Sequence, residues 1–482
     1  MQKIYNYSLS LHLEKVKKIT ATMNNRKNSI YQLGNESVGK LLWQYSIPAI
    51  VGVVVMQLYN IVDRIFIGQG VGSDAIAGLA ITFPVMNLSA AVGTLIGAGA
   101  AARISIVLGQ NDKQKAELIL GNSLVLTLLF GFIYITFFAI FLDDILRLFG
   151  ASDVTLPYAH DFMAYILPGM LMMNLCFSFN SIMRASGYPT RAMVTMFIGA
   201  GLNVILAPIF IFVFDWGIKG AAIATDIAMT ISMLFVMVHF INKKSELHFK
   251  PGIYRLRWHI FTAITAIGAA PFVVNMAGSA LNAIVNNLLH EYGGDAAVGA
   301  MGILMTYAQL LVMVVIGITQ GMQPIIGFNY GARKFNRLKK AFWLSVVAAT
   351  IVTTLGCLGA QFAPHWIARA FTTDTVLIKN TSTALNIGLI MFWAVGFQIV
   401  ATTYFQSLGL AGKSIFLSLT RQILFLLPLV FLFSKLWGLT GIWIAYGTSD
   451  LIATIVTSIM ISIQIRKINK LASSIDSTPK DF

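Results

Sequence analysis

An all-α membrane protein with twelve transmembrane helices in two related halves is the fold that this sequence predicts. The first observation is composition: 57% of the 482 residues are hydrophobic, only 11% are charged, and the mean hydropathy is +0.76. Such values are typical of a chain that crosses a bilayer many times and not of a soluble domain. The second observation is a series of twelve long apolar stretches, and the third is an internal repeat.

Each apolar stretch has about 20–30 residues, which is long enough for a helix to cross a hydrocarbon core of about 30 Å. Helices are expected because they satisfy their own backbone hydrogen bonds in lipid. In chain order the predicted spans are 42–68, 75–99, 116–142, 161–184, 192–214, 218–242, 259–290, 296–323, 341–368, 380–409, 415–436 and 440–465.

Polar segments divide these spans into two lobes. Residues 1–40 are polar and basic and lack the apolar core of a cleavable signal peptide, so we expect a partly disordered cytoplasmic tail. Initiation at Met23 instead of Met1 would leave the pattern of spans unchanged. The remaining predicted parts are the first lobe at 41–242, a cytoplasmic linker at 243–258, the second lobe at 259–465 and a cytoplasmic tail at 466–482.

Lysine and arginine predict the orientation. With both termini inside, the inner segments hold 27 of the 34 basic residues and the outer segments hold six. Basic residues accumulate in the cytoplasmic connectors of membrane proteins, so both termini are expected in the cytoplasm. The net charge of +15 therefore reflects membrane topology and does not indicate a nucleic-acid partner.

The repeat has a period of about 222 residues. Corresponding positions include Pro48 and Pro271, Gly109 and Gly331, Gly187 and Gly409, and the two motifs Trp216-Gly217-x-x-Gly220 and Trp437-Gly438-x-x-Gly441. Two six-helix halves in the same orientation imply two lobes related by an axis along the membrane normal, with a central cavity between them.

Asp63 is the residue in the first span that most needs an explanation. An ionised Asp at the centre of a membrane helix costs roughly 2.5–3.5 kcal/mol on insertion scales. Tyr59 and Asn60 precede it by four and three residues, so a helix places all three on one face. We interpret this face as a proton or cation site; the alternatives are a carboxylate at the outer interface or one paired with Arg64.

The repeat also shows where the two lobes differ. Ile61-Val62-Asp63 corresponds to Ile284-Val285-Asn286, so the titratable Asp63 becomes the neutral Asn286. Asn203 in the fifth span corresponds to apolar residues around Phe425. The first lobe is therefore expected to hold the titratable site.

Other function classes lack their motifs. No H-E-x-x-H or other paired histidine spacing predicts a catalytic metal, and no G-x-x-x-x-G-K-[ST] predicts an ATP-driven pump. Cys176 and Cys357 lie in separate apolar stretches, so neither a disulfide framework nor a C-x-x-C site is expected. We expect no enzyme activity, no cofactor and no bound metal.

Six motifs in order resemble the multidrug and toxic-compound extrusion (MATE) transporters. They are LYNIVDRIFIG at 58–68, RASGYP at 184–189, GLNVILAPIFI at 201–211, WGIKGAAIAT at 216–225, YFQSLGLAGKS at 404–414 and GLTGIW at 438–443. The resemblance covers nearly all of residues 36–465. It is greatest to the bacterial branch that keeps its coupling carboxylate in the amino-terminal lobe.

The resemblance implies a V-shaped, twelve-helix antiporter in the bacterial plasma membrane that exports organic cations in exchange for protons or sodium. Asp63 matches the coupling carboxylate of the family, with Asn203 and Thr225 beside it, and Pro48 matches a proline at which the first helix bends. Further residues are assigned to the substrate cavity: Tyr59, Asn60, Asn180, Met229 and Asn286. The implied partners are small-molecule drugs and the lipid bilayer, and we expect a monomer.

Ala207 is a departure from the family pattern. The fifth-helix motif N-x-x-x-D-P ends here in Ala207-Pro208, so the site lacks one carboxylate. A sodium ion needs several oxygen ligands, by analogy with other hard cations, whereas a proton needs only one carboxylate. We therefore expect proton coupling, with sodium coupling as the alternative. A lipid-linked sugar flippase is disfavoured because only Arg421 places a cation well inside a span.

Three further charged residues lie within spans. Asp226 in the sixth span either compensates for the missing carboxylate or makes a helix contact, and the same alternatives hold for Asp450 in the twelfth. Arg421 is expected to extend its side chain to the cytoplasmic surface.

Overall fold

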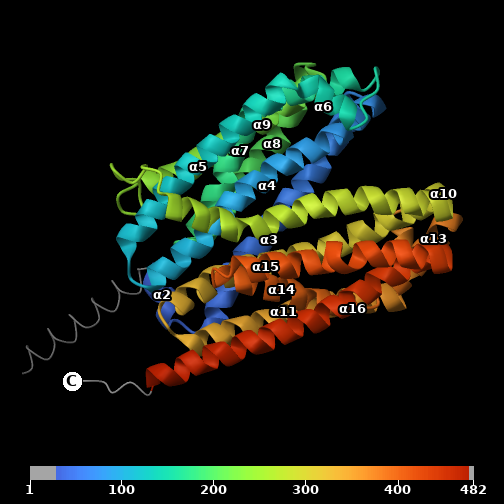
Figure 1. The fold of residues 1–482 in the computed structure, drawn as a ribbon. Coiled ribbons are helices and arrows are strands. Elements are labelled where there is room, and N and C mark those ends of the chain that lie inside the picture. The colour runs from blue at the N-terminus through green and yellow to red at the C-terminus, as the bar shows by residue number, and fades with distance from the viewer. Residues whose placement is uncertain (1–28, 477–482) are drawn as a thin grey trace, which may run out of the picture.

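The computed structural model describes residues 29–476, and the chain in that range is helical and has no strands (Figure 1). Nine of its helices are long and apolar enough to cross a membrane, and a pair bent by 55° provides a tenth span. Two of the nine are interrupted at a glycine and so count as two spans each. The predicted total of twelve spans is confirmed.

The first lobe contains α2 (Ser29–Asn35), α3 (Val38–Gly70), α4 (Ser73–Gly109), α5 (Lys113–Ile140), α6 (Leu142–Leu148), α7 (Leu156–Ala185), α8 (Pro189–Pro208), the π-helix η1 (Ile209–Val213) and α9 (Gly217–Ile241). The second contains α10 (Trp258–Gly331), α11 (Phe335–Phe362), α12 (Pro364–Arg369), α13 (Thr375–Gly388), the 3₁₀-helix η2 (Phe392–Ala394), α14 (Val395–Ser407), α15 (Ala411–Leu419), the π-helix η3 (Thr420–Leu426) and α16 (Leu427–Asp476).

The Trp-Gly-x-x-Gly motif makes the same turn in both lobes. Gly217 at the start of α9 has φ +54°, and Gly438, which divides α16 into two spans, has φ +58°. Glycine adopts this left-handed conformation without steric cost. Gly294 (φ +64°) divides α10 in the same way. The repeat seen in the sequence is thus also a repeat of backbone geometry.

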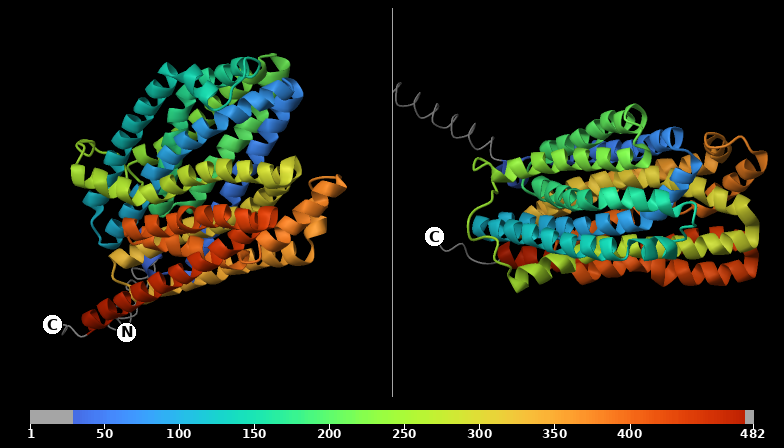
Figure 2. Two further views of the ribbon diagram at one scale, coloured as in Figure 1. Left: turned by 45° about the vertical axis from the view of Figure 1, so that its right-hand side comes forward. Right: turned by 90° about the horizontal axis from the view of Figure 1, so that it is seen from above.

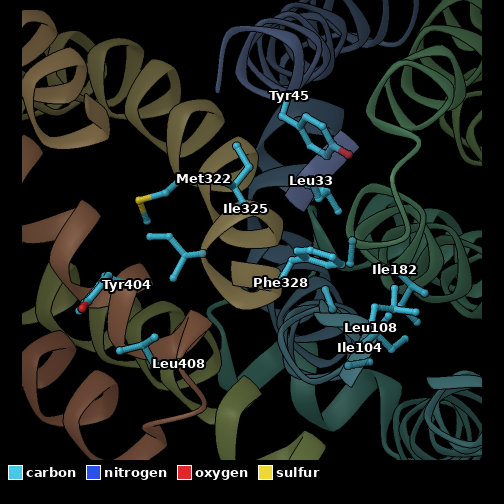
Figure 3. Packing of buried hydrophobic residues seen from close by; sticks show 14 of the residues in the cluster. Leu33, Tyr45, Ile104, Leu108, Ile182, Met322, Ile325, Phe328, Tyr404 and Leu408 are labelled. Atoms are coloured by element: carbon cyan, nitrogen blue, oxygen red, sulfur yellow. The ribbon is translucent and has the colours of Figure 1, made fainter. Parts of the chain in front are cut away.

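The two lobes meet at one end and diverge at the other, as Figure 1 and the left view of Figure 2 show. At the converging end a single core contains side chains from both lobes, including Leu33, Tyr45, Ile104, Phe328 and Tyr404 (Figure 3). Toward the diverging end the buried side chains form separate cores. One surrounds Phe162 and Ile211 in the first lobe, and the other surrounds Leu385 and Trp443 in the second. The expected V shape with two lobes is confirmed.

The pseudo-twofold relation is visible in a close contact at the converging end. A Cβ on Gly109 of α4 would overlap the carbonyl oxygen of Phe328, and one on Gly331 of α10 would overlap that of Ile106. Each of these repeat-related glycines therefore lies against the other lobe's helix, as in a self-complementary interface.

Two of the predicted tails contain helix. Ser29–Asn35, expected within a partly disordered tail, form the helix α2, because Leu33 is fully buried in the core shared by both lobes. The predicted tail at 466–482 is helical through Asp476, since α16 continues beyond the twelfth span. The calls on residues 1–28 and 477–482 lie outside the described residues.

Basic residues of the second lobe hold α2 in place. Arg337 donates to the carbonyl oxygens of Glu36 at 2.6 Å and Leu33 at 3.2 Å, and Lys334 donates to that of Gly34 at 2.8 Å. Cations favour the carbonyl end of a helix. Burial, and then the neighbouring Arg337, lower the pKa of the Lys334 amine below its ordinary value. We call this converging end, which also holds the ion pair of Lys250 and Glu117 at 2.8 Å, the basic end.

Candidate ion-coupling site

The site is built on the half of α3 that points away from the basic end. Tyr59 is 7% exposed and Asp63 is half-buried, and both belong to the face of α3 that turns toward α8 and α9. One carboxylate oxygen of Asp63, Oδ1, is buried without a hydrogen-bond partner. Buried polar atoms without partners are rare in native proteins, so this one requires an explanation.

Arg64 does not neutralise Asp63. Its guanidinium lies 5.3 Å from the centroid of the Phe83 ring, in a cation–π contact with α4, and its side chain is exposed. Among the ion pairs of residues 29–476, none joins Arg64 to Asp63. The alternative in which Asp63 is simply paired with its neighbour is therefore not what the structure shows.

Asn203 and Thr225 lie together beside Tyr59. The Asn203 amide donates to the Thr225 hydroxyl at 2.8 Å, and that hydroxyl donates to the Ala221 carbonyl at 3.0 Å. The Tyr59 hydroxyl is hydrogen bonded to Thr225 and lies near the carboxylates of Asp63 and Asp226. The structure thus brings the three residues assigned to ion coupling, Asp63, Asn203 and Thr225, together around Tyr59.

Two features of α8 define what this cluster lacks. The carbonyl oxygen of the Asn203 side chain, Oδ1, is buried without a hydrogen-bond partner, like Oδ1 of Asp63. Ala207, one turn further along α8, is fully buried and cannot provide the second carboxylate. The cluster therefore has two unused acceptor oxygens and, apart from Asp226, only one formal charge.

Met229 forms an apolar wall beside the polar cluster. It packs with Tyr59 and Ala200 in a small core of its own, to which Met56 and Met173 add partly buried side chains. An unbranched thioether adapts to differently shaped neighbours.

Three residues assigned to the substrate cavity do not join this cluster. Asn60 and Asn286 are exposed on α3 and α10. Asn180 is buried near the basic end, where its amide donates to the Ala192 carbonyl at 2.7 Å and its oxygen accepts a hydrogen bond from Arg184. The predicted common face of α3 divides because adjacent helix positions differ by about 100° in direction, which turns Asn60 away from Tyr59.

Pro48 lies inside α3, which continues as one helix from Val38 to Gly70. The proline lies where α3 packs most closely on α10. A Cβ on Gly317 or Gly321 of α10 would overlap Ile50 or Ser46 of α3, on either side of the proline. Its hinge role stays a prediction.

Arg421 contradicts the sequence-based expectation. It does not extend to the cytoplasmic surface, because its Nε donates to Asp450 Oδ1 at 2.8 Å, and 31% of its side chain is exposed. Asp450 is also held through its backbone carbonyl, which accepts from Gln398 at 2.8 Å. Both residues were singled out from the sequence, but their pairing was not predicted, and neither was the contact of Gln398.

Comparison with known proteins agrees with this arrangement. A sequence model of the MatE family matches residues 48–209 and 271–432, one stretch in each lobe. The multidrug export protein MepA of Staphylococcus aureus (strain NCTC 8325 / PS 47) is 26% identical over 418 residues, which are 86% of this chain and 92% of MepA. MepA of Staphylococcus haemolyticus (strain JCSC1435) is 26% identical over 417 residues, with the same coverage of both chains.

Two solved structures have the same fold. The outward-facing conformation of a multidrug resistance MATE family transporter of the MOP superfamily has a TM-score of 0.85 at 25% identity, covering 92% of this chain and 99% of that one. A MATE structure in the bent conformation has a TM-score of 0.88 at 24% identity, covering 93% and 99%. Because the family model matches more than half of the sequence, this chain belongs to the MatE family of membrane transporters.

Proposed function

We propose that this protein is a secondary active multidrug antiporter that exports organic, cationic amphipathic compounds in exchange for protons. Its working form is a monomer in the plasma membrane, with the basic end and both termini in the cytoplasm. The observation that carries the proposal is Asp63: a half-buried carboxylate without a cationic partner and with one oxygen free of hydrogen bonds. The names of the MepA relatives support the drug-export part.

The chemistry follows from a carboxylate that either a proton or a cationic compound can neutralise. A buried carboxylate is unfavourable when it is ionised and has no cation beside it, and it is equally unfavourable for two cations to crowd against one carboxylate. Binding of a proton therefore excludes the cationic compound, and the reverse. Exchange of the two across the membrane couples their gradients. The lobes diverge away from the basic end (Figure 1), and in the proposed cycle Asp63 exchanges its cation with the outer side at this diverging end.

Sodium coupling is the second candidate, and one observation favours it. Oδ1 of Asn203 and Oδ1 of Asp63 are both acceptors without donors, and oxygen acceptors are the ligands that hard cations prefer. Ala207 opposes it, because the second carboxylate that would strengthen such a site is missing. A flippase for lipid-linked sugars loses support, since the guanidinium of Arg421 is paired with Asp450.

The test uses purified protein in liposomes loaded with tetraphenylphosphonium, a permanent lipophilic cation. An imposed pH gradient without sodium is expected to drive most of the export, and an inward sodium gradient at equal pH is expected to drive little. Asp63→Asn protein in matched liposomes is the control. Export that follows the sodium gradient alone would replace the proton in this proposal, and export that follows neither gradient would contradict coupled antiport.

A further inference from the structure

The carboxyl of Asp226 lies in a notch in α7, by which we mean the backbone surface at Pro168 and Gly169. A Cβ added to Gly169 would overlap the Asp226 carboxyl, so only glycine allows this position. The backbone N–H of Gly169 donates a hydrogen bond to the carboxylate. Pro168, inside α7, has no N–H of its own, so the carbonyl one turn earlier loses its helical donor.

The second lobe fills the corresponding place differently. At the period of the repeat, Pro168 corresponds to Ile390, which lies between α13 and α14, where the tenth span is bent by 55°. Asp226 corresponds to Gly447, whose added Cβ would lie 3.0 Å from Ile390 Cγ2. At this level the first lobe places a carboxyl against a helix backbone, whereas the second lobe places a glycine beside an apolar side chain. A packing role alone does not require a carboxylate, which is the more costly residue to bury.

Asp226 has no cationic partner among the ion pairs of the described chain. The basic residue nearest in sequence on α9, Lys219, pairs with Asp161 at 3.2 Å. From α3, the titratable group that faces Asp226 is Tyr59, whose phenol lies near the carboxylates of both Asp63 and Asp226. From α8 the nearest polar group of the cluster is the neutral Asn203, which bonds to Thr225.

We propose that Asp226, seated in the α7 notch, is a second proton-carrying carboxylate that acts together with Asp63 through Tyr59. Two carboxylates near one phenol repel each other in a low-dielectric site, so they titrate as a pair and not independently. The notch keeps Asp226 at this position while its proton is exchanged, because the Gly169 N–H bonds most strongly to the ionised form.

This inference rests on the proposed function and adds to it a stoichiometry. If one monovalent organic cation leaves as two protons enter, each cycle moves one net positive charge inward. The inside-negative membrane potential then drives export in addition to the pH gradient. With Asp63 alone, one cation would exchange for one proton and the cycle would be electrically neutral.

The first experiment measures the protons released when tetraphenylphosphonium binds to the full-length protein in weakly buffered detergent, scanned over pH with an indicator dye. The wild type is expected to release about two protons per protein at the maximum, since two coupled groups titrate. Asp226→Asn, which keeps the size of the side chain, should release about one. Gly169→Ala, which displaces the carboxyl, should do the same and add nothing in the Asp226→Asn background.

Gly447→Ala is the control for an added methyl group: Gly447 is the repeat-related counterpart of Asp226, and its added Cβ would meet Ile390 and no acid. This variant should release as many protons as the wild type. Unchanged release from Asp226→Asn, together with reduced release from Asp63→Asn, would overturn this inference and leave the proposed function standing. Release that Asp63→Asn does not alter would count against the proposed function itself.

The second experiment measures export from liposomes with a potential set by potassium and valinomycin. An inside-negative potential, in the orientation of the cell, should accelerate wild-type export of tetraphenylphosphonium. The Asp226→Asn protein should lose that acceleration while still responding to a pH gradient. Equal voltage dependence in the two proteins would exclude Asp226 as a charge carrier, whatever the rate of transport.

Discussion

The two lobes each place acidic groups inside their spans but surround them in opposite ways. In the first lobe, Asp63 and Asp226 have no cationic partner, and Oδ1 of Asp63 has no hydrogen bond at all. In the second lobe, Asp450 is paired with Arg421 at 2.8 Å, and its backbone is bound by Gln398. A carboxylate that is neutralised by a side chain of the protein does not require a mobile cation. An unpaired carboxylate in a buried position does require one.

Under the proposed function, this difference assigns ion coupling to the first lobe and a supporting role to the second. Asp450 occupies the position that Met229 has in the first lobe, and Tyr446 that of Thr225. The same framework of helices thus holds an internal ion pair on one side and an open acid site on the other. Four predictions test this division, beginning with the largest expected effect.

Asp63→Asn should reduce drug export to the level of liposomes without protein, because the amide cannot exchange a proton. The substitution reproduces the residue that the second lobe carries at this place, Asn286, so insertion and folding should be retained. The measurement is export of tetraphenylphosphonium driven by a pH gradient, at matched protein content. Asn286→Asp is the control and should keep most of the activity; export by a well-folded Asp63→Asn protein would remove the distinction between the lobes.

Arg421→Ala should destabilise the protein by about 3–5 kcal/mol, the usual effect of leaving one member of a buried pair uncompensated. The double variant Arg421→Met with Asp450→Leu removes both charges and should recover most of that loss. Thermal unfolding in detergent, followed by intrinsic fluorescence, compares these variants with Asp63→Asn, which should melt close to the wild type. If Arg421→Ala also melts like the wild type, the ion pair is not the structural counterpart that we describe.

Ala207→Asp should shift coupling from protons toward sodium. The new carboxylate would lie one turn from Asn203, whose Oδ1 lacks a donor, and would add both charge and ligands to that cluster. Sodium-driven export at equal pH should rise several-fold relative to the wild type. Leu427→Asp is the control, because Leu427 precedes Pro428 as Ala207 precedes Pro208. It should not produce sodium coupling; if it does, the site is not confined to the first lobe.

Pro48→Ala should have the smallest effect, a several-fold slower rate of export with unchanged coupling. Alanine restores a backbone hydrogen bond inside α3 and stiffens the helix about four turns before Asp63. Pro271→Ala at the corresponding position of α10 is the comparison and should slow export less, since the residue that matches Asp63 on that helix is the neutral Asn286. Equal rates for Pro48→Ala and the wild type would exclude a hinge in α3.

Much of the fold could be read from local sequence, because a span requires only a run of apolar residues of sufficient length. The twelve spans were predicted in this way, and so was the division into two lobes. The helix Ser29–Asn35 was not predicted, because it leaves no such local pattern. This short helix is too polar to register as apolar, and it is ordered by contacts of Leu33 with both lobes and by Arg337, far away in the chain.

The candidate site was predictable only in part. Asp63, Asn203 and Thr225 could be found because polar residues inside apolar spans are conspicuous, and the structure places them together around Tyr59. Asn180 has the same signal, yet it bonds to Arg184 near the basic end. The notch at Gly169 was missed. Adjacent proline and glycine in the middle of the fourth span were a usable sign, because they mark a place where a helical hydrogen bond is lost and no side chain covers the backbone.

The sequence by itself determined that this protein is a two-lobed helical membrane protein with its acids unevenly divided, because hydrophobic length, basic connectors and the repeat are properties of the chain. Only the tertiary structure decided which charges are neutralised: Arg421 meets Asp450, Arg64 turns to Phe83, and Asp63 and Asp226 are left unpaired. The reason is geometric. Each residue along a helix turns by about 100°, and rotation and tilt against the neighbouring helices decide which side chains come within hydrogen-bonding distance.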